Sequence, residues 1–399
     1  MIVFVPRTAP GDRVILVHIR RKRRHAEARL AELVEPGPDR VEPACAHFVA
    51  DRCGGCQWQH VGAEAQARAK RRLVGDALRR IGGLALEDPE LVASPRILAY
   101  RSAITLTVRR QGGAQPVVGF HDDVDPDRVF ALDRCAIARD ELNALWKAVE
   151  GSAGELPRGD DVRLKLRVET DGALHLLVSG GDRAWTAGES LAAAARESGL
   201  AVTIWWQPAH GAVRRVAGPE ADAAGVAFGQ VNPEVADAMQ QDVVAWAGGR
   251  EAGMAGGPKR LLDLYAGAGE TALPLAQAGH DVVLVEVDDR AVRRAETRAA
   301  ALGLTLRCIA GNVETHLPKL LPADVVVVNP PRAGLSELVT SRLAALPPSR
   351  LVYVSCDPAT LARDLKRIGA GAGDVRLVRA YDMFPQTSHV ETLVVVERA

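Results

Sequence analysis

The feature that most constrains the fold is a rhythm of short apolar strands and helical segments in the second half of the chain. Runs such as LLDLY, DVVLVE, DVVVVN and RLVYVS are almost continuously apolar and rich in β-branched residues, and helical segments separate them. Continuous apolar strands are buried on both faces, and strand–helix repeats build parallel sheets. The sequence therefore predicts an α/β domain over residues 228–399, with a mostly parallel sheet between two layers of helices.

The upstream half has a different organisation. Residues 2–35 alternate as strands do and are typical of part of a small β-barrel, which a Pro-rich link at 35–43 separates from the rest. A basic helix is predicted near 63–81, and the strand-rich pattern from 101 to about 227 indicates a mixed, largely antiparallel sheet. The predicted domains are 1–42, 43–227 and 228–399.

Charge and apolar patterning restrict the possible surroundings of the protein. Lys and Arg number 50, as do Asp and Glu, so no net field marks a nucleic-acid partner. Local basic clusters at 18–24 and 68–80 are either solvated faces or phosphate contacts. No apolar run is long enough for a membrane span, and Met1 leads directly into a strand-like segment. We expect a cytoplasmic protein, in which six cysteines favour metal binding or catalysis over disulfides.

A glycine-rich turn follows the first strand of the α/β region. Gly267 and Gly269 in DLYAGAGE let the backbone approach a ligand closely, where open α/β sheets bind nucleotides. Asp263 and Glu286 end the first two strands, and a carboxylate offers two acceptors for ribose hydroxyls. A carboxylate inside the glycine motif repels a pyrophosphate and tolerates a cation. This pattern favours S-adenosylmethionine, with NAD as the main rival.

Two asparagines follow later strands of the same region. Asn312 is placed either to meet an adenine edge or to cap a helix. Asn329 begins Asn-Pro-Pro-Arg, where the prolines end the strand and hold the turn rigid. An amide at that edge can contact both a cofactor and a flat base, so the motif indicates a methyltransferase acting on a planar group.

Four cysteines have a spacing that suits metal binding. Cys45, Cys53 and Cys56 form C-x7-C-x2-C, and Cys135 follows in ALDRCAI. Four thiolates can hold a [4Fe–4S] cluster or a structural zinc, and the spacing does not separate the two. Cys308 lies within an apolar strand and is expected to pack in the core.

The remaining cysteine, Cys356, lies in YVSCDPATLARDL, where a strand stops and a helix begins. It is either a small turn residue or a nucleophile whose thiolate adds to C6 of uracil, so that C5 can take a methyl group. We expect the helix start and a nearby sulfonium to lower its pKa. The required base would come from DMFPQTSHVE, which carries His389 and Glu391, although Glu391 alone is also compatible with an ordinary surface acid.

Taken together, the motifs CGGCQWQH, GQVNPEV, DLYAGAGE, NPPRAGL, YVSCDPATLARDL and DMFPQTSHVE resemble the RNA 5-methyluridine methyltransferases, especially the iron–sulfur members acting on ribosomal RNA. The resemblance runs from about Phe4 to the C-terminus. It implies a Rossmann-like class I S-adenosylmethionine methyltransferase domain, a central mixed α+β iron–sulfur and RNA-binding domain, and a partial N-terminal OB-like barrel that binds RNA.

The resemblance also implies roles for individual residues. Cys356 would be the nucleophile and Glu391 the general base. The cofactor contacts would be Gln230, Tyr265, Glu270, Glu286, Asn312 and Asn329. The [4Fe–4S] ligands would be Cys45, Cys53, Cys56 and Cys135.

The sequence departs from the family pattern at three further points besides its short barrel. Seven residues separate the first two cysteines, where five are usual, which should only lengthen a loop. Asn329 replaces the usual aspartate; because an amide both accepts and donates, discrimination against cytosine is expected to be looser. Asp357 replaces an asparagine beside the cysteine, and its negative charge should raise the pKa of the thiol.

These inferences predict a monomeric RNA (uracil-5-)-methyltransferase, with S-adenosylmethionine and a [4Fe–4S] cluster as cofactors and no membrane association. Its expected product is 5-methyluridine in 23S ribosomal RNA, made through a covalent cysteine–C6 intermediate. The alternatives are a transfer-RNA 5-methyluridine enzyme, an RNA 5-methylcytosine enzyme, and a catalytically idle RNA-binding protein.

Overall fold

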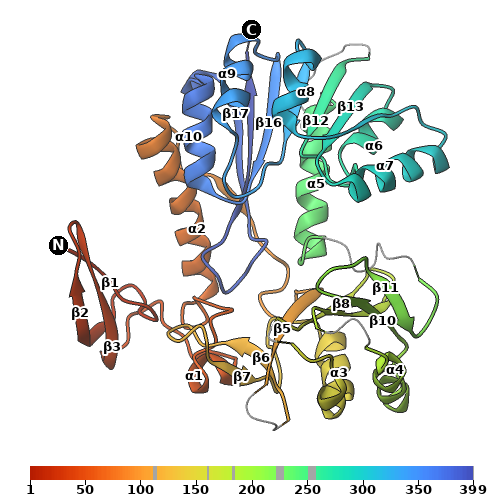
Figure 1. The fold of residues 1–399 in the computed structure, drawn as a ribbon. Helices are drawn as coiled ribbons and strands as arrows, with labels where there is room; N and C mark the ends of the chain where they lie inside the picture. Colours follow the sequence, from red (N-terminus) through yellow and green to blue (C-terminus); the bar gives the residue numbers. More distant parts are fainter. Residues whose placement is uncertain (111–114, 160, 182–184, 222–228, 250–257, 399) are drawn as a thin grey trace. The chain divides into compact units, whose positions relative to one another are not determined.

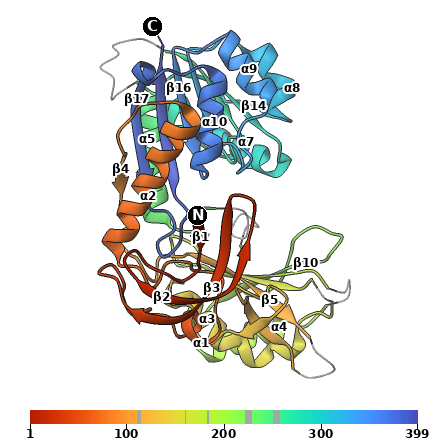
Figure 2. The ribbon, with the colours of Figure 1, turned by 90° about the vertical axis from the view of Figure 1, so that its left-hand side faces the viewer.

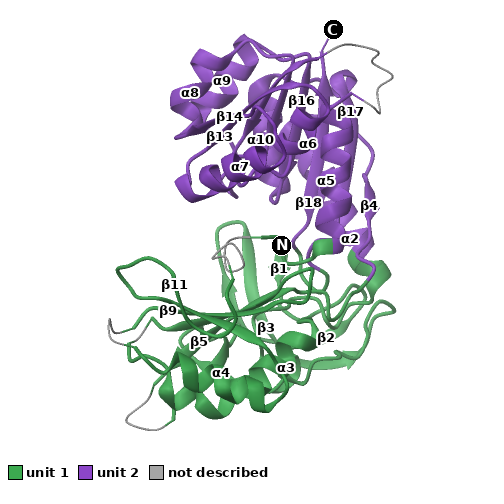
Figure 3. Ribbon diagram, turned by 90° about the vertical axis from the view of Figure 1, so that its right-hand side faces the viewer, with its two compact units in different colours: residues 1–66, 96–233, 385–388 green, residues 67–95, 234–384, 389–399 purple. Residues whose placement is uncertain are grey.

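The computed structural model describes residues 1–399 except 111–114, 160, 182–184, 222–228, 250–257 and 399 (Figure 1). The contacts divide these residues into two compact units (Figure 3). Unit 1 comprises 1–66, 96–233 and 385–388, and unit 2 comprises 67–95, 234–384 and 389–399. Segments 67–95 and 385–388 are thus separated from their sequence neighbours, and the three-domain division stays a prediction.

Unit 2 is built on an eight-stranded sheet with the order β14-β13-β12-β15-β16-β18-β17-β4. The strands predicted from the apolar runs are present, and β18 runs antiparallel to both of its neighbours. The other pairs in this sheet are parallel, which confirms the predicted sheet type. The strands are β4 (Glu90–Val92), β12 (Arg260–Leu264), β13 (Asp281–Glu286), β14 (Arg307–Ala310), β15 (Val325–Val328), β16 (Arg350–Ser355), β17 (Val375–Tyr381) and β18 (Glu391–Glu397).

Helices cover both faces of this sheet because its strands are apolar on both sides. One core joins strand residues such as Leu262 and Tyr353 to α8 (Val313–Leu320), α9 (Glu337–Ala345), α10 (Pro358–Ile368), α2 (Ala63–Ala77) and the π-helical turn η1 (Leu78–Gly82). The other joins residues such as Val327 and Val354 to α5 (Pro233–Ala247), α6 (Ala272–Gln277) and α7 (Asp289–Ala301). Helices α2 and α10 lie side by side in Figures 1 and 2. A short 3-10 turn, η4 (Ala372–Asp374), precedes β17.

Unit 1 contains a seven-stranded sheet in the order β11-β10-β9-β8-β5-β6-β7. Only β9 and β10 pair in parallel, so the predicted mixed, largely antiparallel sheet is present. Helices α3 (Asp140–Val149) and α4 (Gly188–Glu197) and the 3-10 turn η2 (Glu150–Glu155) pack on it. The strands are β5 (Ala103–Arg109), β6 (Val117–His121), β7 (Val129–Ala131), β8 (Arg163–Val168), β9 (Leu174–Ser179), β10 (Val202–Gln207) and β11 (Arg214–Ala217).

The N-terminal segment of unit 1 forms a three-stranded sheet in the order β1-β3-β2. Its strands are β1 (Ile2–Phe4), β2 (Arg13–Arg21) and β3 (His25–Glu35), and the short helix α1 (Ala46–Ala50) follows. The predicted strands exist, whereas a barrel is not confirmed. Among the described residues, no helix has the length and apolarity needed to cross a bilayer.

Candidate active site and cysteine cavity

Cys356 and Glu391 lie on neighbouring strands at one edge of the unit 2 sheet. Cys356 comes directly after β16, and Glu391 is the first residue of β18. The antiparallel register pairs Ser355 with Thr392. One step further along both strands, Cys356 and Glu391 face each other. The predicted pair of thiol and carboxyl is thus brought together by strand pairing.

The turn after Cys356 is held by the residue that follows it. The Asp357 carboxylate accepts hydrogen bonds from the backbone N–H groups of Ala359 and Thr360, each at 2.9 Å. It is therefore the N-cap of α10, the role in which aspartate satisfies otherwise unpaired helix donors. The replacement of the family asparagine thus keeps the capping function.

The predicted lowering of the Cys356 pKa by the start of the following helix is outweighed in the structure, and the predicted effect of a sulfonium stays a prediction. Burial raises the pKa of Cys356 above its ordinary value, and the neighbouring Glu391 raises it further. Arg332 opposes these effects, and Asp357 contributes the predicted increase in the pKa. The start of α10 does not overcome desolvation, because its first donors are already bonded to Asp357.

Glu391 is not a surface acid. Glu391 is 5% exposed, and burial raises the pKa of its carboxyl to about 7, although Arg332 counteracts the shift. A carboxyl with this pKa is close to half ionised at neutral pH, which suits a group that takes up and releases protons. His389 is exposed and its ring lies edge-on to Phe384, so Glu391 is the better candidate base.

The predicted cofactor residues of unit 2 gather where parallel strands end. Tyr265, Glu286 and Asn329 lie at the ends of β12, β13 and β15, and Asn312 follows β14. The carboxyl ends of parallel strands meet at one edge of a sheet, where α/β folds bind ligands. Glu286 accepts hydrogen bonds from the backbone N–H groups of Gly267 and Asp288, each at 2.9 Å, so its carboxylate is fixed against the glycine turn.

The remaining predicted contacts have different surroundings. Asn312 occupies the N-cap position of α8, yet its side chain makes no capping hydrogen bond and is exposed. Asn329 is also exposed, and its backbone N–H donates to the Leu264 carbonyl. Glu270 is exposed and forms an ion pair with Arg298 at 3.1 Å. Gln230 belongs to unit 1, whereas the other five predicted contacts belong to unit 2, so its role as a cofactor contact stays a prediction.

Asp263 is the most deeply buried acid at this edge. It is 3% exposed, and its Oδ2 atom has no hydrogen-bond partner among the described residues. Burial, together with the acids Glu270 and Glu286, raises the pKa of Asp263 to about 8, although a hydrogen bond from the Ala272 backbone opposes the shift. A buried carboxyl with one oxygen unpartnered is costly when ionised, and a cation at this edge would relieve that cost.

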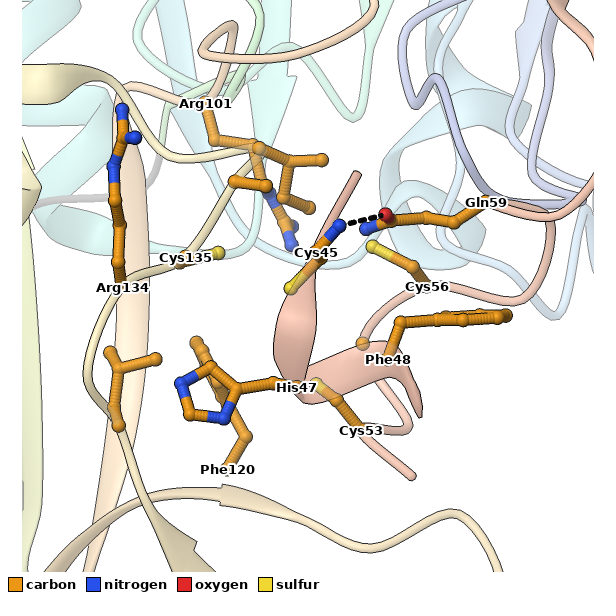
Figure 4. A pocket seen from close by; sticks show the side chains of 14 residues that line it. Cys45, His47, Phe48, Cys53, Cys56, Gln59, Arg101, Phe120, Arg134 and Cys135 are labelled. Atoms are coloured by element: carbon orange, nitrogen blue, oxygen red, sulfur yellow. Dashed lines mark hydrogen bonds between the residues drawn. The ribbon is translucent and has the colours of Figure 1, made fainter. Parts of the chain in front are cut away.

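The four predicted ligand cysteines line one cavity of about 40 Å³ in unit 1 (Figure 4). Cys45 precedes α1, Cys53 and Cys56 flank two glycines, and Cys135 lies in the loop before α3. No disulfide joins them. The rest of the lining is largely apolar or cationic: His47, Phe48, Gly55, Gln59, Arg101, Phe120, Leu132, Arg134, Ala136 and Ile137.

Hydrogen bonds to three of these sulfurs stabilise the thiolate form. Cys53 accepts from the backbone of Gly55, Cys56 from the Gln59 side chain, and Cys135 from the backbone of Ile137 and Ala138. The Gly54 amide donates to the carbonyl of His121 rather than to a cysteine sulfur. Burial nevertheless raises the pKa of Cys53 to about 11 and that of Cys56 to about 12.

The cavity does not have the arrangement of a closed site for a single ion. In the described part of the chain, no group of three or more His, Cys, Asp or Glu side chains is placed so that it could hold a metal ion. Metal ligation by the four cysteines is therefore not confirmed. The donor set itself fits a thiophilic group, because four thiols from three separate segments converge on one enclosed space.

Comparisons with known proteins decide the family. The model of the tRNA (Uracil-5-)-methyltransferase family matches residues 319–399, and that of the methyltransferase small domain matches residues 254–348. A 23S rRNA (uracil(1939)-C(5))-methyltransferase RlmD from Alkalilimnicola ehrlichii is 36% identical, covering 99% of this chain and 92% of that protein. The chain belongs to the RNA 5-methyluridine methyltransferase family. The predicted enzyme class, an RNA (uracil-5-)-methyltransferase, is thereby confirmed.

Other relatives of this methyltransferase agree with the assignment. The uncharacterized RNA methyltransferase tlr0942 of Thermosynechococcus vestitus is 33% identical, covering 99% of this chain and 93% of that protein. The solved Pyrococcus abyssi tRNA (uracil-54, C5)-methyltransferase, in complex with S-adenosyl-L-homocysteine, has a TM-score of 0.75 and 23% identity, over 99% of this chain and 95% of that chain. The similarity to this solved structure confirms the class I methyltransferase fold.

Several structural residues of the methyltransferase were not identified from sequence. Gln59 accepts the Cys45 N–H at 3.1 Å as well as bonding Cys56, and Asn143 accepts the Cys135 N–H at 2.9 Å. Lys70 belongs to the basic cluster at 68–80, which we interpreted as a solvated face or as phosphate contacts, but it is fully buried and paired with Asp382 at 2.5 Å. The sequence showed only that Lys70 lies in a basic run, and such a run predicts an exposed side chain rather than a buried one.

We predict that S-adenosylmethionine binds beside Asp263, so that the raised pKa of this carboxyl makes cofactor affinity depend on pH. A cationic ligand favours the carboxylate, so affinity for S-adenosylmethionine should rise as pH increases from about 6 to about 8, by up to about tenfold per pH unit. Binding at pH 7 should release a proton, which calorimetry in buffers of different ionisation enthalpy measures. Asp263→Asn should bind weakly without this pH dependence. The same dependence of cofactor affinity on pH in Asp263→Asn would contradict a contact between Asp263 and the cofactor.

Proposed function

We propose that the protein transfers a methyl group from S-adenosylmethionine to C5 of a uridine in 23S ribosomal RNA, through a covalent bond between Cys356 and C6 of the base. The observation that carries this proposal is the opposed pair of Cys356 and Glu391, at the sheet edge that also gathers Tyr265, Glu286 and Asn329. Bound S-adenosylmethionine would supply an electrophilic methyl group at this edge.

The proposed reaction uses the two side chains in sequence. The Cys356 thiolate adds to C6, and the electrons of the C5–C6 double bond move toward the C4 carbonyl, which makes C5 nucleophilic. C5 forms the new bond to the methyl group while the donor's carbon–sulfur bond breaks. Glu391 then removes the C5 proton, the C5–C6 double bond re-forms, and Cys356 leaves as the thiolate. The base must leave its stack to reach the thiol.

Ribosomal RNA is the proposed substrate because relatives named as 23S rRNA enzymes align over nearly the whole chain. The exposed basic residues of the β2–β3 hairpin, Arg20 to Arg24, suit phosphate contacts. The experiment that tests the proposal is mapping of 5-methyluridine in ribosomal and transfer RNA from cells with and without this gene. Loss of one 5-methyluridine from 23S RNA is expected.

The other outcomes of that mapping are equally clear. Loss of 5-methyluridine from transfer RNA alone, or of 5-methylcytosine, would replace the proposed substrate. Tight RNA binding by the purified protein without transfer of labelled methyl would favour an idle RNA-binding role.

Asn329 is the observation that favours cytosine as a second candidate base. Its exposed amide both accepts and donates hydrogen bonds, whereas the usual carboxylate of the family accepts only. Uracil presents a donor at N3 and cytosine an acceptor, so a carboxylate rejects cytosine and an amide tolerates it.

We therefore expect Asn329→Asp to sharpen the preference for uridine. The ratio of kcat/KM for target RNA containing uridine to that for RNA containing cytidine should rise about tenfold, the effect of one charge-assisted hydrogen bond. The measurement is nucleoside analysis after reaction with the two RNAs. An unchanged ratio would remove Asn329 from base selection.

We further propose that the four-cysteine cavity holds a [4Fe–4S] cluster. Four thiols face one enclosed space, and hydrogen-bond donors reach three of the sulfurs, as cluster ligands require. A single zinc ion instead needs its four ligand sulfurs within about 2.3 Å of one point. Zinc is therefore the alternative occupant of the four thiolates, and the metal content of the purified protein separates the two.

Protein purified without oxygen should contain about four iron atoms and a broad visible absorption. Cys135→Ser should lose most of both, because one ligand and its hydrogen bonds disappear. Cys308→Ser is the matched control, because Cys308 packs against the unit 2 core and should retain the iron. Zinc in place of iron in the unaltered protein would contradict the cluster.

A further inference from the structure

The loop that carries Asn329 and Arg332 is fastened by two consecutive residues of α10. The Arg363 guanidinium donates to the carbonyl of Ala333 at 2.7 Å and to that of Leu335 at 3.4 Å. The Asp364 carboxylate accepts the Leu335 N–H at 2.7 Å. Three backbone groups at the far end of the Asn329–Leu335 loop are therefore bonded to one turn of one helix.

The same carboxylate is bonded to the strand that leads to Cys356. The Tyr353 hydroxyl, three residues before Cys356, donates to Asp364 Oδ2 at 2.8 Å. Asp364 and Tyr353 are both fully buried. The negative charge is balanced by Arg363, whose guanidinium contacts the other oxygen, Oδ1, at 2.8 and 2.9 Å. A buried carboxylate with this many donors has one defined position.

Gly334 shows how closely the loop lies against α10. A Cβ atom added there would overlap the Asp364 carboxylate and would lie 2.6 Å from an Arg363 nitrogen. Gly334 also has a φ of +74°, which disfavours any side chain. The loop thus has no room to shift toward the helix, and its hydrogen bonds prevent it from moving away.

We propose that Asp364, balanced by Arg363, is a positioning residue that holds the Asn329–Arg332 segment in register with Cys356. It joins the loop after β15, the strand β16 and the helix after the nucleophile through one side chain. The inference rests on the proposed roles of Asn329 and Cys356. Asp364 would touch neither substrate nor cofactor, and would act by fixing the distance between the groups that do.

The test compares Asp364→Asn with unaltered protein in single-turnover reactions, using methyl transfer to uridine RNA and covalent trapping on 5-fluorouridine RNA. A displacement of about 1 Å at a reacting centre costs on the order of 10²-fold in rate. We expect both rate constants to fall by about that factor, with the amplitudes unchanged. Loss of amplitude at an unchanged rate constant indicates fewer folded molecules and would overturn the positioning role.

Two further variants keep the test decisive if Asp364→Asn folds poorly. Gly334→Ala retains the Asp364 carboxylate, but its added methyl group pushes the loop away from α10. It should therefore lower the same rate constants. Combining it with Asp364→Asn should add little further loss. Arg367→Ala, on the same helix and paired with Glu337 at 3.0 Å, is the control and should react normally. Normal rate constants in folded Gly334→Ala would overturn the inference.

The two readouts separate this inference from the proposed mechanism. If unaltered protein methylates uridine but forms no adduct on 5-fluorouridine RNA, then the role of Cys356 fails, and the methyl-transfer rates still decide the role of Asp364. If adducts form normally in Asp364→Asn, then positioning fails while the covalent mechanism stands.

Discussion

The Cys356→Ala variant should form no covalent adduct with RNA that carries 5-fluorouridine at the target position. In the unaltered protein, addition to C6 and methyl transfer proceed. Because C5 carries fluorine in place of hydrogen, a base has no C5 proton to remove, elimination stops, and the adduct persists. Without the thiol, methyl transfer to ordinary uridine should fall by on the order of 10⁴-fold or more, since removal of a nucleophile leaves only binding and electrostatic contributions. Denaturing electrophoresis of labelled RNA and a methyl-transfer assay measure the two effects.

The control for this experiment is Cys308→Ala. Cys308 belongs to β14 and packs against the unit 2 core, so its removal tests the loss of a thiol without loss of the candidate nucleophile. We expect Cys308→Ala to give the adduct. An adduct that survives Cys356→Ala, or none with the unaltered protein, would refute covalent catalysis by this residue.

The Glu391→Gln variant should accumulate a covalent complex with ordinary uridine RNA. Glutamine has nearly the same shape but cannot take up the C5 proton, so addition and methyl transfer occur and elimination stops. Turnover should fall by about 10²–10⁴-fold, the usual contribution of a general base. Mass spectrometry should find the methylated nucleotide attached to a peptide that contains Cys356.

The pKa of Glu391 predicts how elimination depends on pH in the unaltered protein. The carboxyl must be ionised to accept a proton, and its raised pKa of about 7 leaves it partly protonated below neutrality. The elimination rate should therefore increase as pH rises through about 7 and then level off. Rapid release of RNA by Glu391→Gln would show that another group is the base.

The strand ends of unit 2 could be predicted because their causes are local. Buried parallel strands require continuous apolar side chains, so the first polar residue after VLV or VVVV marks the edge where ligands bind. Glu286 and Asn329 were found in this way, Cys356 follows one residue after the polar Ser355, and their strands lie as expected. The resemblance contributed Glu391, which periodicity alone cannot distinguish from a surface acid.

The features that were missed depend on contacts between distant segments. The pKa of Cys356 is set by burial and by Glu391 across the sheet, so the local helix start was a poor guide. Lys70 is buried against Asp382, which lies 312 residues away in sequence. Asp364 likewise joins a loop and a strand that precede it. Tertiary packing decides which charged side chains are buried and paired, and the residue type alone does not predict it.

The insertion of β18 between β16 and β17 also sets the order in which the catalytic pair is completed during synthesis. Cys356 is made before β17, and Glu391 only after it, so the thiol has no facing carboxyl until the strand that comes later in sequence enters the sheet between its two neighbours. The proposed catalytic pair is therefore complete only when β18 has entered the sheet between β16 and β17.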